Sequence, residues 1–329
     1  MRAFEYARPR SVDEAIRLLG EPGVATAALA GGTDLLPLMK SGILAPRRLV
    51  SLTALDSLRG IVSLPGGGIR IGALASLDDL LADTALRRDY PALVQAAGGI
   101  RSPQIRCVGT VGGDLCQRPR CWYFRNGFGL LARREGRSML EEGENRHHAI
   151  LGNEGLAAFV NPSSLAPPLI ALGATAVLMG PGGTREVPLA RLYRTPVREA
   201  DRELDLDHGE ILAELRIPAA AGRRNATYEI RQRQALDWPL AAAAAVLELD
   251  GDVIRQARIV LGQVAPVPWP APEAEAVLAG RAATARLGDV AGEAALRNAR
   301  GLGHNDYKIR LARVALKRAV LRAAGSLAG

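Results

Sequence analysis

Hydrophobic and polar positions along the first third of the chain follow two periods, one typical of helices and one of strands. Apolar residues recur at helical spacing over 12–19, between a capping box formed by Ser11 and Glu14 and the terminating Gly20. The small apolar run 24–30 predicts a buried strand, and so does the run 69–74, which precedes a hydroxyl-capped helix start at Ser76. We therefore expect helices and strands to alternate in this part of the chain.

The alternation stops over residues 116–163, which are rich in Arg, Glu and Gly and show little periodicity. Irregular segments of this length inside a compact domain are usually functional or disordered, so we expect an insertion at about 116–160. A helix pattern over 165–172 and strand patterns over 175–179 and 210–217 then resume the alternation.

The sequence Ala-Ala-Ala-Gly at 219–222 predicts a domain boundary, and the patterns after it are those of a smaller α+β unit. Residues 228–233 predict a strand, and 243–249 and 253–261 predict a hairpin around Asp250–Gly251. A closing helix is expected over 306–323, with Asn305 as its N-cap. The expected domains are therefore 1–220 and 221–329.

Composition narrows the class of protein. The 329 residues are 48% hydrophobic and 23% charged, which excludes a mainly disordered chain. No apolar run approaches the roughly 18 residues of a membrane span, and the first residues lack the apolar stretch of a secretory signal. The net charge is +8, but there is no run of five basic residues and only 4% of residues are aromatic, so we expect no nucleic-acid partner.

Two glycine-rich segments carry the candidate chemistry. In the first, 30–40, a strand enters the pair Gly31–Gly32 and a helix opens at Thr33 or Asp34. Glycines let a ligand approach the main chain, and consecutive amides at a helix start bind anions, so this segment predicts a phosphate or pyrophosphate site. The alternative is a tight turn that binds nothing. The pattern is neither a GxGxxG fingerprint nor a P-loop.

The second segment, 105–115, places three glycines around the hydroxyl of Thr110. Two such segments in one domain predict a single extended ligand whose diphosphate is bound by free main-chain amides near Gly31 and Gly112. A glycine-rich turn without a ligand remains the alternative here too.

These two segments, in this order, resemble the FAD-binding medium subunit of molybdenum-containing hydroxylases, the family of xanthine and carbon monoxide dehydrogenases. The resemblance extends over nearly the whole chain, through the segments 161–166, 228–233, 237–239, 262–269 and 305–308. It implies an α+β architecture: a bipartite FAD-binding domain of the vanillyl-alcohol-oxidase type, followed by a smaller α+β C-terminal domain. The residues that it assigns to FAD are Ala30, Gly31, Gly32, Thr33, Asp34, Leu35, Leu36, Arg106, Thr110, Gly113, Asp114 and Ser164.

The segments 117–125 and 143–152 resemble one branch of the family, the aldehyde oxidoreductase and 4-hydroxybenzoyl-CoA reductase type. That branch carries an extra four-iron cluster held by four cysteines. Cys121 stands at the first ligand position, but the other positions fall near Leu131, near Met139 and within 155–157, where there is no cysteine. We therefore expect the insertion to be present and the cluster to be lost. The alternative is an unusual cluster on Cys107, Cys116, Cys121 and either His147 or His148.

Four residues depart from the family pattern: Ser164 and Glu229 replace an aspartate and a lysine, and Asp114 and Cys107 stand where asparagine is more usual. Serine can still bond a hydroxyl of the cofactor, but without charge. An ionised Asp114 would repel a diphosphate, so we expect it to face a hydroxyl or the main chain. Arg106 is expected to offset the diphosphate charge, and the alternative is a surface arginine without a ligand.

The resemblance implies an oxidoreductase subunit that moves electrons and carries no catalytic acid, base or nucleophile of its own. Non-covalent FAD would pass electrons between two-iron clusters of a small partner and an external acceptor, while a large partner holds the molybdenum cofactor. The alternatives are a self-sufficient flavin oxidase and a structural subunit that has lost FAD. The expected compartment is the cytoplasm, or the periplasm if a partner carries an export signal.

Overall fold

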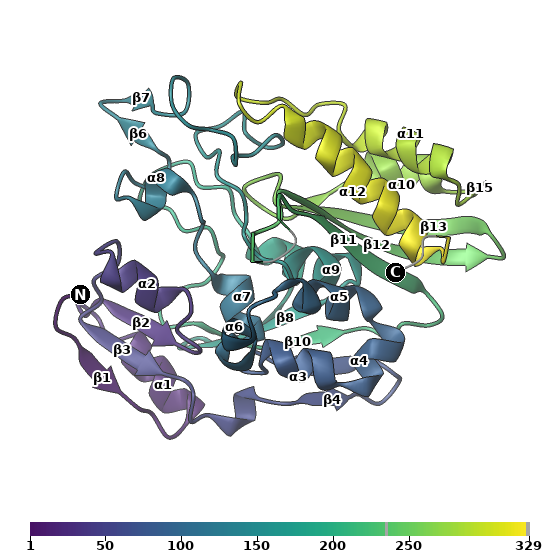
Figure 1. Cartoon of the computed structure of the whole chain (residues 1–329). Helices are drawn as coiled ribbons and strands as arrows, with labels where there is room; N and C mark the ends of the chain where they lie inside the picture. Colours follow the sequence, from purple (N-terminus) through teal and green to yellow (C-terminus); the bar gives the residue numbers. More distant parts are fainter. Residues whose placement is uncertain (234–235, 327–329) are drawn as a thin grey trace.

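Three larger β-sheets, besides the two-stranded pair β6-β7 described below, organise the computed structural model, which describes residues 1–233 and 236–326 (Figure 1). The first sheet has the order β1-β3-β2, and all of its pairs are parallel. Its strands are β1 (Glu5–Ala7), β2 (Thr26–Leu29) and β3 (Arg48–Ser51), accompanied by helices α1 (Val12–Leu19) and α2 (Leu35–Lys40). The predicted cap of α1 is confirmed, because Ser11 Oγ accepts the amide of Glu14 at 3.1 Å.

The second sheet is antiparallel, with the order β4-β5-β10-β8-β9. Its strands are β4 (Ile61–Ser63), β5 (Ile69–Gly72), β8 (Thr175–Gly180), β9 (Gly183–Pro188) and β10 (Ile211–Ile217). The helices of this part of the chain are α3 (Leu77–Ala82), α4 (Thr84–Asp89), α5 (Pro91–Gly99), α6 (Pro103–Val108), α7 (Val111–Cys116) and α9 (Ala166–Ala171), with 3-10 turns η1 (Asp56–Leu58) and η2 (Leu189–Leu192).

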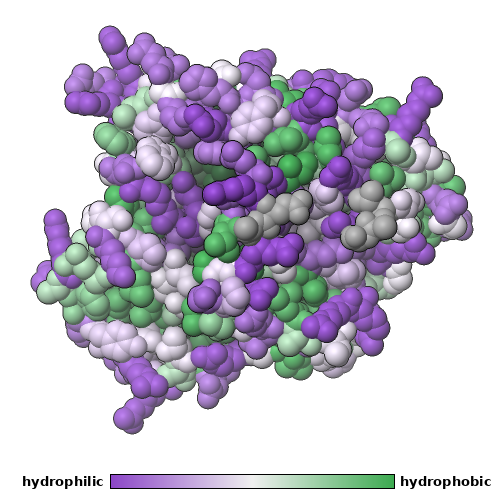
Figure 2. All heavy atoms as spheres, viewed as in Figure 1, coloured by the Kyte–Doolittle hydropathy of each residue, from purple (hydrophilic) through white to green (hydrophobic). Residues whose placement is uncertain are grey.

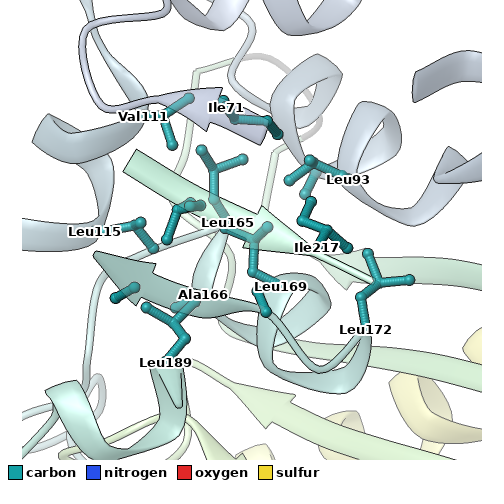
Figure 3. Packing of buried hydrophobic residues seen from close by; sticks show 14 of the residues in the cluster. Ile71, Leu93, Val111, Leu115, Leu165, Ala166, Leu169, Leu172, Leu189 and Ile217 are labelled. Atoms are coloured by element: carbon teal, nitrogen blue, oxygen red, sulfur yellow. The ribbon is translucent and has the colours of Figure 1, made fainter. Parts of the chain in front are cut away.

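A single apolar core joins this sheet to its helices. Figure 3 shows Ile71 and Ile217 of the sheet packed with Leu93, Val111 and Leu165. All five side chains are at most 2% exposed. Burial of this kind contributes roughly 1.5–3 kcal/mol per large side chain, so this core holds α7, and with it the second glycine-rich segment, in place.

The third sheet is also antiparallel and forms the C-terminal part, with the order β11-β12-β13-β14 and β15 paired to β13. The strands are β11 (Arg224–Ile230), β12 (Ala241–Asp250), β13 (Val253–Gly262), β14 (Trp269–Pro270) and β15 (Arg281–Ala282). Helices α10 (Pro272–Leu278), α11 (Ala285–Ala295) and α12 (Tyr307–Ala323) cover one face of it (Figure 1).

Strand β12 is apolar on both faces, and the structure explains why. Ala243 and Ala245 lie in the core under the C-terminal helices, whereas Ala244 and Val246 lie in the core of the second sheet. Successive side chains of a strand point to opposite faces, so a strand shared by two cores reads as a continuous apolar run.

The insertion is largely irregular, as predicted. It contains the short helix α8 (Trp122–Arg125) and the two-residue strands β6 (Arg133–Arg134) and β7 (Arg137–Ser138), and it lies between α2 and the start of α12 (Figure 1). Two polar side chains of the C-terminal part hold it. Lys308 Nζ donates to the carbonyls of His147 (3.2 Å) and His148 (3.0 Å), and Asn305 Nδ2 donates to those of His148 and Ala149 (both 3.1 Å).

Three local predictions differ from the structure. Strand β2 is only partly buried along its length rather than buried. The strand expected at 228–233 runs from Arg224 to Ile230 instead. Asn305 does not cap α12: its Oδ1 accepts the amide of Leu302 at 2.6 Å, and its Nδ2 binds the insertion.

The face seen in Figure 2 is mostly hydrophilic, with apolar residues in small groups between charged ones. No helix within residues 1–233 and 236–326 is long and apolar enough to cross a membrane.

Candidate functional site

The two glycine-rich segments, almost eighty residues apart in sequence, touch each other. A Cβ atom placed on Gly31 would lie 1.9 Å from the carbonyl oxygen of Val108 and 3.3 Å from Cα of Gly109. Only a residue without a side chain allows the main chains to approach this closely. Gly31 therefore serves the contact between the two segments.

The first segment presents unused amides. Gly32 takes the left-handed conformation (φ 72°) that turns the chain from β2 into α2. The main-chain N–H groups of residues 31–35 donate to no acceptor among the described residues. Unpaired main-chain donors are uncommon unless water or a ligand accepts from them, so this turn has the chemistry of an anion site.

The second segment is different, and the expectation of free amides there is wrong. The amide of Gly112 donates to the carbonyl of Ala73 at 2.8 Å, and the amide of Gly113 donates to Thr110 Oγ1 at 3.0 Å as the cap of α7. A Cβ on Gly112 would lie 3.0 Å from Cβ of Ala73, so this glycine is needed for close packing against the end of β5. The segment thus contributes surface without side chains, and the amides of Gly112 and Gly113 are already used.

A cleft of about 280 Å³ opens where the two segments meet. Some of the residues predicted to bind FAD line this cleft. They come from both glycine-rich segments and from the turn before α9: Thr33, Asp34, Thr110, Gly113, Asp114 and Ser164. The remaining predicted residues do not line it: Ala30, Gly31, Gly32, Leu35, Leu36 and Arg106. Of these, Gly31 and Gly32 shape the turn, and Leu36 packs beside Gly32.

Arg106 is the predicted residue that the structure places elsewhere. Its Nε lies 3.2 Å from Oδ1 of Asp78, on the neighbouring helix α3. Its charge is therefore balanced within the protein and does not reach the cleft. The arginines that do line the cleft are Arg101, Arg120 and Arg231, none of which stood out in the sequence.

Asp114 is bound to hydroxyl and main-chain donors, as expected. Its Oδ1 accepts from the hydroxyl of Ser163 and from the amide of Leu165 (3.1 Å), and its Oδ2 accepts from Nε2 of Gln117 (3.2 Å). Burial raises the pKa of this carboxyl, while the Ser163 hydroxyl and the amides act to lower it. Asp114 therefore fastens α7 to the turn before α9.

Ser164 is 5% exposed, and its Oγ has no hydrogen-bond partner among the described residues. Nε of Arg231, which is distant from Ser164 in sequence but lines the same cleft, also has no hydrogen-bond partner among the described residues. A buried polar atom without a partner costs about 1–3 kcal/mol, so two of them at one cleft indicate a ligand with polar groups.

Glu229 and Arg231 form a buried ion pair beside the cleft, with side-chain exposures of 7% and 10%. Burial raises the pKa of Glu229 to about 7, against the opposing effect of Arg231. Arg231 therefore balances the charge of this carboxyl when it is ionised. In the sequence, only the resemblance of 228–233 to the family drew attention to this segment.

Asp34 has a role that the sequence did not show. Its Oδ1 accepts from Nη2 of Arg125 at 2.7 Å, and its Oδ2 accepts from the amide of Arg118 at 2.9 Å. Arg120 lies 3.5 Å from the same carboxylate and stacks 3.9 Å from the ring of Trp238. One carboxylate therefore ties the first segment to the start of the insertion.

The insertion has an apolar interior at the positions where the resembling branch holds its extra cluster. Cys121 packs against a group that contains Leu131 and Ala157, and also against a group that includes Met139. Within the described residues, no three His, Cys, Asp or Glu side chains are grouped so as to hold a metal ion. The alternative cluster on all three cysteines and a histidine is therefore not assembled, and Cys107 is exposed on α6.

Comparison with known proteins agrees with this architecture. A family model described as "FAD binding domain in molybdopterin dehydrogenase" matches residues 2–220, and one described as "CO dehydrogenase flavoprotein C-terminal domain" matches residues 226–323. The chain is 34% identical to the aldehyde oxidoreductase FAD-binding subunit PaoB of Escherichia coli (strain K12), over 84% of this chain and 86% of PaoB. It is 31% identical to the carbon monoxide dehydrogenase medium chain of Hydrogenophaga pseudoflava, over 96% of each.

A solved structure of carbon monoxide dehydrogenase from Hydrogenophaga pseudoflava, which lacks the Mo-pyranopterin moiety of its cofactor, superimposes with a TM-score of 0.78 at 30% identity and covers 99% of both chains. The fold is thus the expected FAD-binding domain followed by a C-terminal domain, and it defines an oxidoreductase subunit. The chain belongs to the family of FAD-binding medium subunits of molybdenum hydroxylases.

Proposed function

We propose that this chain carries FAD between the two glycine-rich segments and transfers electrons within a heteromeric molybdenum hydroxylase. The observation that supports this most is the close contact of Gly31 with Val108, which sets five unused amides (residues 31–35) beside the cleft. Bound FAD would exchange single electrons with iron–sulfur clusters and electron pairs with an acceptor, which is chemistry of the cofactor.

The residues present fit this cofactor. The amides of 31–35 suit the diphosphate, and the hydroxyl of Ser164 and Nε of Arg231 offer polar partners inside the cleft. Thr33, Asp34, Thr110, Gly113 and Asp114 complete the proposed wall. For Arg106 we propose no contact with FAD.

The proposed division is a FAD-binding domain over 1–220 and a C-terminal domain over 221–329. Support comes from the sheet of β11–β13, which begins at Arg224, and from the ranges of the two matching family models. The proposed partners are a large subunit with the molybdenum cofactor and a small subunit with two-iron clusters, as relatives named as medium chains suggest.

The test is the composition of the native assembly. We expect one FAD per chain of this type, molybdenum in the large subunit, and no more iron than the small subunit's two-iron clusters require. A chain purified without flavin absorbance would indicate a structural subunit, and oxidation of a small molecule by the isolated chain would indicate a self-sufficient oxidase. Either result would contradict the proposal.

We further propose a cytoplasmic location, with transport to the periplasm by a partner as the alternative. All three cysteines are free, which suits a reducing compartment. Cell fractionation of the producing organism distinguishes the two compartments.

A further inference from the structure

A second cavity, of about 360 Å³, adjoins the proposed FAD cleft. It lies between the insertion, the segment that follows β11 and the start of α12. Arg120 and Trp238 line both spaces, together with Leu236, Asp237 and Pro239. A molecule bound in this cavity would therefore be separated from the cleft by a shared wall of side chains.

The cavity has aromatic and apolar walls. Trp122, Phe159 and Trp238 contribute rings, and Leu236 contributes an aliphatic surface. Trp122 and Leu236 are 69% and 72% exposed, so large apolar side chains also stand at its solvent side. Its volume lies near the lower end of the ~300–1,000 Å³ usual for small-ligand sites. These dimensions and walls suit a flat, ring-sized molecule.

The basic side chains of the cavity already have partners. Lys308 Nζ donates to the carbonyls of His147, His148 and Gln263. Arg233 is paired with Asp237 at 2.9 Å, and Arg120 faces Asp34 and the ring of Trp238. Because no lining arginine or lysine among the described residues is left to balance a phosphate, the cavity is poorly suited to a nucleotide.

The inner wall carries a carboxylate, Glu144, which is paired with Arg146 at 2.6 Å. Cys121 and His148 of the same wall lie within hydrogen-bond distance, 3.4 Å from Sγ to Nε2. A neutral ligand can therefore enter without burying an unpaired carboxylate.

Gln263 supplies a polar atom without a partner. The residue is 4% exposed, and Nε2 of its side-chain amide, which is buried, hydrogen-bonds to no described residue. Its main chain has a φ of 63°, in the left-handed region that non-glycine residues rarely occupy. Strained residues and unpaired buried amides are both concentrated at binding sites, and here one residue on the cavity wall shows both features.

We propose that this cavity binds a neutral quinone, held between aromatic rings and hydrogen-bonded through a carbonyl oxygen to the amide of Gln263. The proposal rests on the proposed function, because it names the class of electron acceptor. The quinone would take up two electrons and two protons from the reduced flavin and become a quinol, while the flavin returns to its oxidised form. A nucleotide acceptor would need the unpaired cations that the cavity lacks.

Binding can be tested without turnover. Two of the chain's three tryptophans line the cavity, so we expect 2,3-dimethoxy-5-methyl-1,4-benzoquinone to quench tryptophan emission of the native assembly in a saturable way. Gln263→Leu should weaken this binding about tenfold, the loss expected from one hydrogen bond. Trp122→Ala should also weaken it, and because Trp122 is exposed, this variant retains its fold. Phe128→Ala, an exposed aromatic residue of the same insertion outside the cavity, is the matched control and should bind normally.

Steady-state turnover then tests the quinone site separately from the proposed FAD function. With ferricyanide, which accepts electrons without a binding pocket, both cavity variants should retain wild-type rates, while their KM for the quinone rises about tenfold. If FAD is present and both variants bind and reduce the quinone normally, the quinone site is wrong and the flavin function stands. If the native assembly carries no FAD, the proposed function fails, but quenching still reports on the cavity. Competition by NADH for the quenching site would also overturn the proposal.

Discussion

Replacing Gly31 by alanine tests the contact on which the proposed site depends. The added Cβ would lie 1.9 Å from the oxygen and 2.7 Å from the carbon of the Val108 carbonyl. Both are main-chain atoms, so no side-chain rotation can relieve the clash. The two segments must separate by more than about 1 Å before the contact reaches the ~3.3 Å of an ordinary close C···O approach.

Such overpacking costs about 1–3 kcal/mol, and more where the main chain has to move. If this cost falls on the FAD-bound form, affinity for FAD drops about 5- to 150-fold, since each 1.4 kcal/mol changes a binding constant tenfold. We therefore expect the Gly31→Ala assembly to be purified with clearly substoichiometric FAD, although its tertiary fold persists.

The assay compares flavin absorbance per chain and the FAD titration of the cofactor-free protein. Gly182→Ala is the matched control, because Gly182 has nothing within 4 Å of its hypothetical Cβ and its φ lies outside the strained region. This control should bind FAD normally. Full FAD occupancy and unchanged affinity in Gly31→Ala would refute the argument that contact between the two segments builds the site.

Four further predictions concern charged groups and the insertion. Lys308→Met removes three hydrogen bonds to carbonyls and should lower the free energy of unfolding by about 2–4 kcal/mol, measured by urea denaturation. The carboxyl of Glu229 has a pKa of about 7 in the folded protein, above its ordinary 4.5. Its contribution to the free energy of unfolding is therefore present below pH 4.5 and is lost as the pH rises to 7. In urea denaturation at several pH values, Glu229→Gln should remove this part of the pH dependence. Asp34→Asn should lower the free energy of unfolding by about 1–3 kcal/mol and speed proteolysis of the insertion. As the control, Asp289→Asn breaks an exposed ion pair with Lys317 and should change the free energy of unfolding by less than about 0.5 kcal/mol. Cys121→Ser should leave the iron content of the assembly unchanged, and a chelator should remove no iron from the isolated chain. Loss of iron in either experiment would show that the insertion binds a cluster.

Much of the fold was predictable because the signals are local. The cap at Ser11, the hairpin around Asp250–Gly251 and the irregular insertion depend on residues that are neighbours in sequence, and the structure confirms them. The Asn305 cap was wrong because Oδ1, the atom that would accept a helix amide, accepts the amide of Leu302 instead, while Nδ2 donates to the distant carbonyl of His148.

The candidate site was predictable in part. Paired glycines mark places where main chains come close, so both segments could be found from sequence. The amides that remain free could not be predicted, because the amide of Gly112 donates to the carbonyl of Ala73, a residue far from it in sequence. Arg231 was not assigned to the site from the sequence, and the structure pairs Arg106 with Asp78 outside the cleft, because the partners of an arginine are known only once its acidic neighbours are placed.

By itself, the sequence determined the first helix, the hairpin around Asp250–Gly251, the two glycine turns and the lack of cysteine at three expected ligand positions, because turn chemistry and side-chain period act over a few residues. The tertiary structure alone decided that Gly31 meets Val108, that β12 serves two cores and that Gln263 lines the second cavity. Burial and hydrogen-bond pairing depend on segments far apart in the sequence, and no local pattern records which distant group occupies the other side of a contact.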